Sequence, residues 1–148
     1  MVEILVDTNV LVYAHDRTEP EKQWRALDVL DRLVAADTGV LSTQVLAEFY
    51  NTSTRKIATP LHPAQAYEQV KHFLQIWRVL DVTGAVVLGA IRGVREHQFN
   101  FWDAQIWAVA RLNQVPVVFS EDFPGAVIEG IRFVNPFAED FQPEAWGL

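Results

Sequence analysis

The sequence predicts an α/β fold in three layers, in which helices cover both faces of a central, mostly parallel sheet. Short apolar and β-branched segments alternate along the chain with longer segments whose apolar residues repeat at helical spacing. The first short segment, Val2–Val6, is typical of a strand buried on both faces. The segment Asn100–Asn113 is apolar almost all round, which predicts a central helix.

The predicted elements follow one another without a repeat, a low-complexity tract or a linker. We therefore expect residues 1–148 to form a single domain, with residues 138–148 as a C-terminal extension. The predicted strands span residues 2–6, 39–42, 78–82, 115–119 and 131–134, and the last one is expected at an edge of the sheet. The predicted helices span residues 10–14, 20–37, 43–58, 63–77, 83–97 and 100–113, and residues 120–125 are a predicted turn.

Capping and breaking residues set the limits of the first three helices. The polar run Asp7–Asn9 offers caps for the first helix, and Pro20 fits the first turn of the second. Ser42 and Thr43 cap the third helix, and Thr59–Pro60 breaks it. The second helix repeats apolar residues at three- and four-residue spacing, which we expect to face the core: Trp24, Leu27, Leu30, Leu33 and Val34. Core or dimer contacts are expected of three aromatic residues: Tyr13, Trp24 and Tyr50.

The composition excludes several classes of protein. The chain is 50% hydrophobic and 21% charged, as in a packed globular domain, and it has no cysteine. The lack of cysteine excludes a disulfide scaffold, a thiolate metal site and a cysteine nucleophile. The longest apolar run, Ala85–Ile91, is far shorter than the about 20 residues that span a membrane. No signal peptide is evident at the N-terminus, so we expect a cytoplasmic protein without a membrane partner.

Four acidic residues are predicted to meet at one edge of the sheet. Asp7 directly follows the first strand, and Asp122 comes shortly after the strand at 115–119. Glu48 lies in the second turn of the helix that leaves the 39–42 strand, and Asp103 lies at the start of the helix that returns to the sheet. Parallel strands end at the same edge, where α/β folds bind their ligands, so these carboxylates are expected to lie close together.

Each acid also has an ordinary structural explanation. Asp7 can cap the helix that follows it, and Asp103 can be a first-turn acid with Asn100 as the cap. Glu48 aligns with Gln44 and Thr52 on what can be a solvated stripe, and Asp122 can be a residue of a surface turn: these explanations do not require a shared edge.

A meeting of several carboxylates requires a cation. Two of them at about 4 Å repel each other by about 4 kcal/mol at an effective dielectric constant of about 20. Oxygen ligands without cysteine favour Mg²⁺ or Mn²⁺, and such a site is suited to hydrolysis of a phosphodiester by an activated water. The formal net charge of −7 is consistent with this, because the metal brings the positive charge that binding a polyanion needs.

The same residues, in this order, resemble the PIN domain over nearly the whole chain. The resemblance rests on Glu48 and on four segments: Val6–Leu11, Phe101–Ala104, Ser120–Asp122 and Gly130–Phe137. It implies a Mg²⁺- or Mn²⁺-dependent ribonuclease, and at this chain length it looks most like the VapC-type toxin of a toxin–antitoxin pair. It also implies a homodimer and an antitoxin protein whose tail blocks the acidic groove.

The resemblance implies a role for each matching residue. Asp7, Glu48, Asp103 and Asp122 are the implied metal-binding and catalytic acids. Asn9 and Ser120 are implied supports that orient Asp7 and the metal waters, and Glu121 either supports the site or merely flanks it. Whether one or two ions act is not fixed by the sequence.

Contacts with the RNA substrate are expected from basic residues near the acids. Arg92 and Arg95 lie three residues apart on the helix before Asp103, and Arg55 and Lys56 end the helix of Glu48. All four can equally be part of solvated helix faces. Trp102 can stack on a base, although an aromatic residue at a helix start is more often part of the core.

Two other functions compete with the nuclease hypothesis. A phosphatase with an aspartyl nucleophile would resemble Asp-x-Asp after the first strand, whereas this chain has Asn9 at the second position and no suitably placed lysine stands out. The second alternative is a catalytically weak or silent PIN module that acts in protein interaction. All four acids are present, so the sequence gives no sign of such decay.

Overall fold

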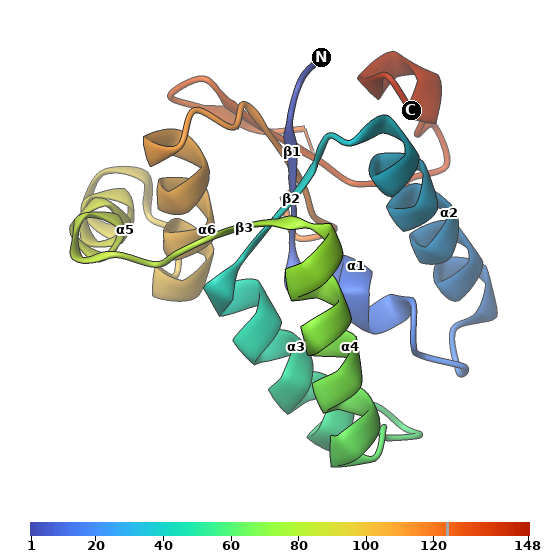
Figure 1. Cartoon of the computed structure of the whole chain (residues 1–148). Helices are drawn as coiled ribbons and strands as arrows, with labels where there is room; N and C mark the ends of the chain where they lie inside the picture. The colour runs from blue at the N-terminus through green and yellow to red at the C-terminus, as the bar shows by residue number, and fades with distance from the viewer. Residues whose placement is uncertain (124) are drawn as a thin grey trace.

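The protein is described by a computed structural model that covers residues 1–123 and 125–148 (Figure 1). Six strands form one sheet in the order β3-β2-β1-β4-β6-β5. All neighbouring strands are parallel except β5 and β6, which form an antiparallel hairpin. The strands are β1 (Ile4–Val6), β2 (Gly39–Ser42), β3 (Arg78–Leu80), β4 (Val117–Phe119), β5 (Val127–Ile128) and β6 (Ile131–Val134).

Helices cover both faces of the sheet, as predicted. The path β1-β2-β3 moves outward in one direction, and the chain then crosses back to β4 beside β1. Because such crossovers are right-handed, the connections before and after β3 lie on opposite faces. Figure 1 shows α5 and α6 on one side of the sheet and α2 on the other, with α3 and α4 extending beyond the end of β2. The helices are α1 (Thr8–Tyr13), α2 (Pro20–Ala36), α3 (Thr43–Arg55), α4 (Pro63–Ile76), α5 (Gly84–His97) and α6 (Phe101–Leu112), with a 3₁₀ turn η1 (Pro143–Trp146) near the C-terminus.

The core forms where the sheet meets α6 and α2. Every residue of β1 and β4 is buried, which explains why both strands are almost entirely apolar. In α6 all positions from Ala104 to Ala110 are buried, so the prediction of a central helix is confirmed. The residues after the last strand return to this core, since the Phe141 ring packs edge-on against Phe119 at a centroid distance of 5.5 Å.

The prediction that the last strand lies at an edge of the sheet is wrong. The strand β6 is not at the edge, because the two-residue strand β5 pairs with its outer side. Glu129 and Gly130, at φ 49° and 84°, form the tight turn between them, and two positive φ values suit a twisted hairpin. The predicted turn at 120–125 includes position 124, which lies outside the described residues.

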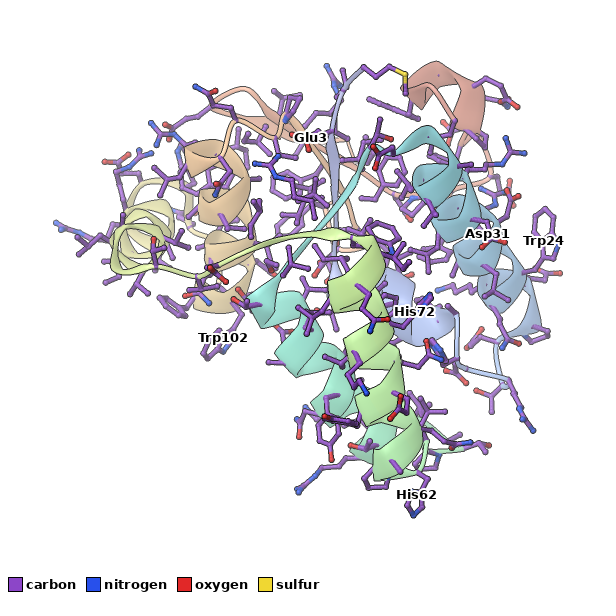
Figure 2. The ribbon with its side chains drawn as sticks, viewed as in Figure 1. Glu3, Trp24, Asp31, His62, His72 and Trp102 are labelled. Carbon is purple, nitrogen blue, oxygen red and sulfur yellow. The ribbon has the colours of Figure 1, made fainter. Side chains whose placement is uncertain are left out.

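The apolar residues of α2 do not all face the core. Leu30 and Leu33 are buried together with Ala26 and Val29, but Trp24, Leu27 and Val34 are exposed. Trp24 and Asp31 both project away from the molecule in Figure 2. The chain has two apolar stripes on this helix, and spacing alone does not tell which one meets the sheet. Tyr50 is likewise exposed, so of the two roles predicted for it the core contact is wrong and the dimer contact stays a prediction.

No helix in the described part of the chain has both the length and the apolar character that a membrane crossing requires.

We predict that Gly39→Ala destabilises the fold, because a Cβ atom at this position of β2 would overlap the indole ring of Trp77. Overpacking of this kind costs about 1–3 kcal/mol, which urea unfolding would measure. Gly84→Ala is the matched control: it lies at the first position of α5 with no atom within 4 Å of the new Cβ, and we expect it to leave stability unchanged or raise it by about 0.5 kcal/mol. Equal effects of both substitutions would contradict the proposed overlap.

Candidate functional site

The candidate site begins where β1 and β4 end side by side. The register pairs Val6 with Phe119, so Asp7 and Ser120 are neighbours at the carboxyl edge of the sheet. The Asp7 carboxylate accepts a hydrogen bond from the backbone N–H of Thr8 at 2.7 Å and another from the Ser120 hydroxyl at 2.8 Å. Asp7 is only 6% exposed, so one of the acids is fixed in a buried position by two strands.

The other three predicted acids reach the same place from separate elements. Glu48 comes from the second turn of α3, Asp103 from the first turn of α6 and Asp122 from the loop after β4. All four acids line one cleft, so the predicted shared edge of the sheet is confirmed, although no three of these carboxylates bring their oxygen atoms within 4.8 Å of one another among the described residues. The cleft is lined by Asp7, Thr8, Asn9, Val12, Tyr13, Asp16, Gln44, Glu48, Thr52, Trp102, Asp103, Ile106 and Asp122.

Hydrogen bonds hold the loop that carries Asp122. The Asn9 amide donates to the Ser120 hydroxyl at 3.3 Å and to the Asp122 carboxylate at 3.4 Å. The backbone N–H of Asp122 donates to the Ser120 hydroxyl at 3.1 Å. Asn9 and Ser120 therefore link Asp7 to Asp122.

The ordinary explanations of Asp7 and Asp103 also hold. Asp7 caps α1, and the Asn100 side chain caps α6 by accepting from the backbone N–H of Asp103 at 3.0 Å. The Asn100 amide also donates to the Asp103 carboxylate. Capping fixes the start of each helix and thereby aims the acids, so the structural and functional explanations are compatible.

Gln44 connects α3 to α6 beneath the cleft, and its role was missed in the sequence. Its amide donates to the backbone carbonyl of Trp102 at 3.1 Å and to Glu48, and its oxygen accepts from Gln105 at 2.9 Å. Its position one turn before Glu48 was the available signal, but the shared stripe was equally explained by solvent exposure. Gln44 is 8% exposed and thus belongs to the buried wall of the site.

Burial, with a smaller contribution from the neighbouring acids, changes the protonation of Asp7 and Asp103. Burial raises the pKa of Asp7 from 3.8 to about 6, and repulsion from Asp122 and Glu48 adds to this, although the two hydrogen bonds oppose it. Partial burial also raises the pKa of Asp103, again with repulsion from Asp122 and Glu48. Both shifts mean that the folded protein holds these negative charges at a cost that a bound cation would reduce.

The residues around the cleft fit a divalent cation. Thr8 Oγ1 and Asn9 Oδ1 are buried oxygen atoms with no hydrogen-bond partner among the described residues, and both residues line the cleft. Orphaned oxygen atoms beside carboxylates are suitable partners for Mg²⁺ or Mn²⁺ and for the waters that such ions retain. Asp7, Glu48, Asp103 and Asp122 are the residues that would hold the ion.

Glu121, for which the resemblance implied either a supporting or a flanking position, is bound by Tyr13 and Lys22. Its carboxylate accepts from the Tyr13 hydroxyl at 2.6 Å and pairs with the Lys22 ammonium at 2.9 Å. The Lys22 ammonium also lies 4.6 Å from the centre of the Tyr13 ring. Glu121 does not line the cleft and instead ties the Asp122 loop to α1 and α2. Lys22 was not identified from the sequence, because nothing local indicates a partner so distant in the chain.

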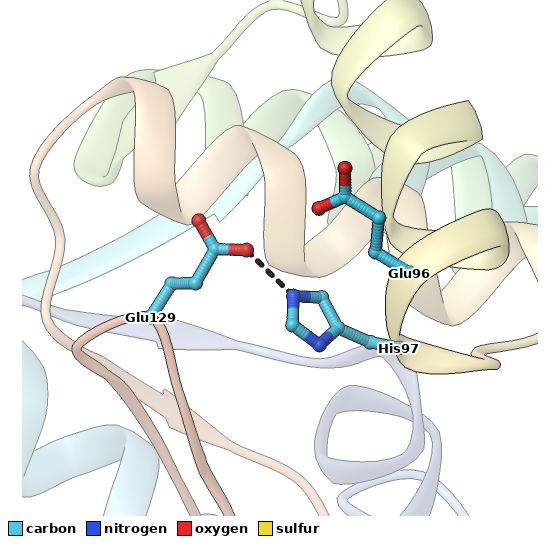
Figure 3. Close-up of side chains that lie close together, drawn as sticks. All are labelled: Glu96, His97 and Glu129. Carbon is cyan, nitrogen blue, oxygen red and sulfur yellow. Dashed lines mark hydrogen bonds and ion pairs between the residues drawn. The ribbon is translucent and has the colours of Figure 1, made fainter.

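A different acidic cluster lies away from the cleft. Among the described residues, one trio of side chains brings its ligand atoms within 4.8 Å of one another: Glu96, His97 and Glu129 (Figure 3). The Glu129 carboxylate already pairs with Arg92 at 2.9 Å, with Arg111 at 3.1 Å and with His97 at 2.6 Å. These partners lower the pKa of Glu129 to about 2. The trio is an ion-pair network that ties the β5–β6 turn to α5 and α6.

The four basic residues proposed for RNA contact do not gather around the acids. Arg92 is engaged by Glu129 and Glu96, and with Arg95 it lines a separate hollow on α5. Arg55 ends α3 and is exposed. Lys56 alone among the four lines a cavity that adjoins the cleft.

A mostly parallel α/β sheet whose carboxyl edge carries a cleft of four acids is the class of fold that binds ligands at this edge. The PIN domain family model matches residues 4–123, and the chain belongs to this family. The predicted fold class and the stated resemblance to this family are thus confirmed. Among curated proteins, none matches this chain.

Several solved structures share the fold. The chain is similar to FitAcB from Neisseria gonorrhoeae, with a TM-score of 0.64, 20% identity, and coverage of 90% of this chain and 98% of that one. It is similar to VapC20 from Mycobacterium tuberculosis, a sarcin–ricin loop cleaving toxin, with a TM-score of 0.60, 22% identity, and coverage of 88% and 99%. It is also similar to a chain of a toxin–antitoxin complex from Klebsiella pneumoniae, with a TM-score of 0.62, 18% identity, and coverage of 90% of this chain and 98% of that one.

We predict that Asp7→Asn stabilises the metal-free protein at pH 7.5 by about 1–3 kcal/mol, because it removes a buried charge. The pKa of Asp7 is about 6 in the folded protein and 3.8 as the ordinary value, so the folded state binds more protons between these pH values. The wild type therefore gains stability relative to Asp7→Asn as the pH falls from 7.5 to 5. Urea unfolding of both proteins in a chelating buffer measures this, and a difference independent of pH would show that Asp7 titrates normally.

Proposed function

We propose that this PIN-domain protein is a Mg²⁺- or Mn²⁺-dependent endoribonuclease, and that it is the cytoplasmic toxin of a toxin–antitoxin pair. The observation that carries the proposal is the cleft at the sheet edge, where Asp7, Glu48, Asp103 and Asp122 converge from four separate elements. The raised pKa of Asp7 and the orphaned oxygen atoms of Thr8 and Asn9 support a cation there. VapC20, which has the same fold, cleaves the sarcin–ricin loop, and this supports RNA as the substrate.

Each residue has a distinct task in the proposed reaction. A bound Mg²⁺ or Mn²⁺ supplies Lewis acidity and lowers the pKa of a water. Asp7 and Asp103 would be the main metal ligands, while Glu48 and Asp122 would bind a second ion or its waters or hold the attacking water. Ser120 and Asn9 orient Asp7 and Asp122 through the hydrogen bonds described above. Glu121 fixes the Asp122 loop from outside through Lys22 and Tyr13.

Antitoxin binding and dimer formation are further parts of the proposal. The similar protein from Klebsiella pneumoniae forms part of a toxin–antitoxin complex, and another similar chain belongs to DNA-bound VapBC from Salmonella typhimurium. An antitoxin tail that carries basic residues would complement the acidic cleft. A homodimer is expected from the family resemblance, and sedimentation of the purified chain would test it.

We predict that millimolar Mn²⁺ raises the melting temperature by about 5–10 °C, since saturation at 100 times the Kd adds about 2.7 kcal/mol. Asp7→Asn and Asp103→Asn should lose most of this shift, measured by differential scanning calorimetry. Glu129→Gln should retain it, because Glu129 belongs to the ion-pair network on α5 rather than to the cleft. If Glu129→Gln abolished the rise in melting temperature and Asp7→Asn kept it, the metal would bind at the cluster of Glu96, His97 and Glu129, which would contradict the proposed site.

We predict that the wild type cleaves cellular RNA in Mn²⁺, and that Asp7→Asn, Glu48→Gln, Asp103→Asn and Asp122→Asn each lower the rate by about 100-fold or more. Asp31→Asn removes an exposed carboxylate on α2 and should leave the rate unchanged. Gel-resolved time courses give the rates. No cleavage by the wild type in Mg²⁺ or in Mn²⁺ would favour the silent interaction module. A phosphorylated Asp7 would favour the phosphatase with an aspartyl nucleophile.

A further inference from the structure

A second cavity adjoins the acidic cleft and is not explained by metal binding. Its lining shares four residues with the cleft: Gln44, Glu48, Thr52 and Trp102. The cavity extends from this shared wall along one face of α3, which supplies Ala47 and Asn51, toward Lys56 at the end of the helix. A ligand bound in the cleft can therefore continue directly into this second cavity.

Trp102 stands at the boundary between the two cavities. Its side chain is 61% exposed, and it projects from the first turn of α6 beside the start of α3 (Figure 2). The backbone under it is fixed, because Gln44 donates to the Trp102 carbonyl at 3.1 Å. The Phe101 ring packs edge-on against the indole, with the two ring centroids 5.0 Å apart. An exposed aromatic face on a fixed backbone is the arrangement that binds unpaired bases by stacking.

The rest of the cavity suits a nucleotide. Ala47 and Val82 contribute apolar surface to the cavity, and the amide of Asn51, one turn from Ala47 on α3, can meet the edge of a base. Lys56 brings a positive charge to the cavity, and the acidic cleft next to it has none of its own. Charge is thus segregated: a cation in the cleft and Lys56 beyond it would each bind a phosphate of one strand.

We propose that the cavity of Trp102 and Lys56 is the binding site for the nucleotide next to the cleaved phosphate, with its base stacked on Trp102 and its far phosphate on Lys56. This inference rests on the proposed ribonuclease function and specifies the substrate as single-stranded RNA, because a base within a duplex has no free face. A basic protein segment would complement the carboxylates of the cleft but not the positive charge of Lys56, whereas one RNA strand offers a phosphate to a cation in the cleft and another phosphate to Lys56.

The test measures binding separately from cleavage. Fluorescence anisotropy of a labelled, mixed-sequence single-stranded RNA with Ca²⁺ in place of Mn²⁺ gives the Kd without requiring turnover. Trp102→Ala should weaken binding by about tenfold or more, and Trp102→Phe should restore most of the affinity, because both aromatic rings stack. Lys56→Ala should weaken binding and reduce the dependence of log Kd on log salt by about one unit.

Trp24→Ala is the matched control, because Trp24 is 65% exposed on α2 and lies outside both cavities. It should bind RNA like the wild type. With Mn²⁺, an abasic nucleotide next to the cut should slow the wild type to the rate of Trp102→Ala and leave the Trp102→Ala rate unchanged.

Failure of this inference differs from failure of the ribonuclease function. A wild type that binds single-stranded RNA through Trp102 but does not cleave it would remove the nuclease activity and leave the binding site. Cleavage and binding by Trp102→Ala at wild-type levels would overturn the binding site and leave the nuclease. A change in sedimentation of Trp102→Ala would assign the face to contact between copies of the chain instead, and would also overturn it.

Discussion

The buried carboxylate of Asp7 is the constraint on which the site depends. Its position follows from the pairing of β1 with β4. Its two hydrogen bonds come from the backbone N–H of Thr8 and the hydroxyl of Ser120, neither of which carries a positive charge. The two hydrogen bonds only partly offset the loss of hydration, since the pKa of Asp7 remains raised to about 6. The fold therefore holds a carboxylate whose charged form is disfavoured by its own burial, and a cation that enters the cleft would offset this cost.

The local rules of helix formation and the requirements of the site act through the same residues. Asp7 and Asn100 each start a helix, and each cap sets the direction of an acidic side chain. The capping interpretation of these positions was right and did not compete with the functional one. Ordinary capping at the end of a parallel strand delivers polar groups to the edge where ligands bind, so a fold of this class gains a site with few additional residues.

Sequence patterns predicted the features that depend on order along the chain. The strands and helices follow from the spacing of apolar residues. The shared edge follows from crossover geometry, and it brings together Asp7, Glu48, Asp103 and Asp122. Features that depend on the partner of a side chain were not accessible. Lys22 finds Glu121 and Arg92 finds Glu129 only after the sheet has assembled, and the buried stripe of α2 is chosen by the shape of the surface opposite it. Hairpin strand β5 is too short to produce a pattern of its own.

The distribution of charge has a consequence for how a polyanion would approach. With a net charge of −7, long-range attraction to RNA is absent, and basic residues such as Lys22, Arg92 and Arg111 are paired with carboxylates of the same chain. Affinity must then come from short-range contacts: the cation in the cleft, the face of Trp102 and the charge of Lys56. Contacts of this kind discriminate by local structure, because only an unpaired strand presents a phosphate and a free base together. On the proposed function, an acidic protein of this kind would avoid most nucleic acid and would bind the few segments that fit both cavities.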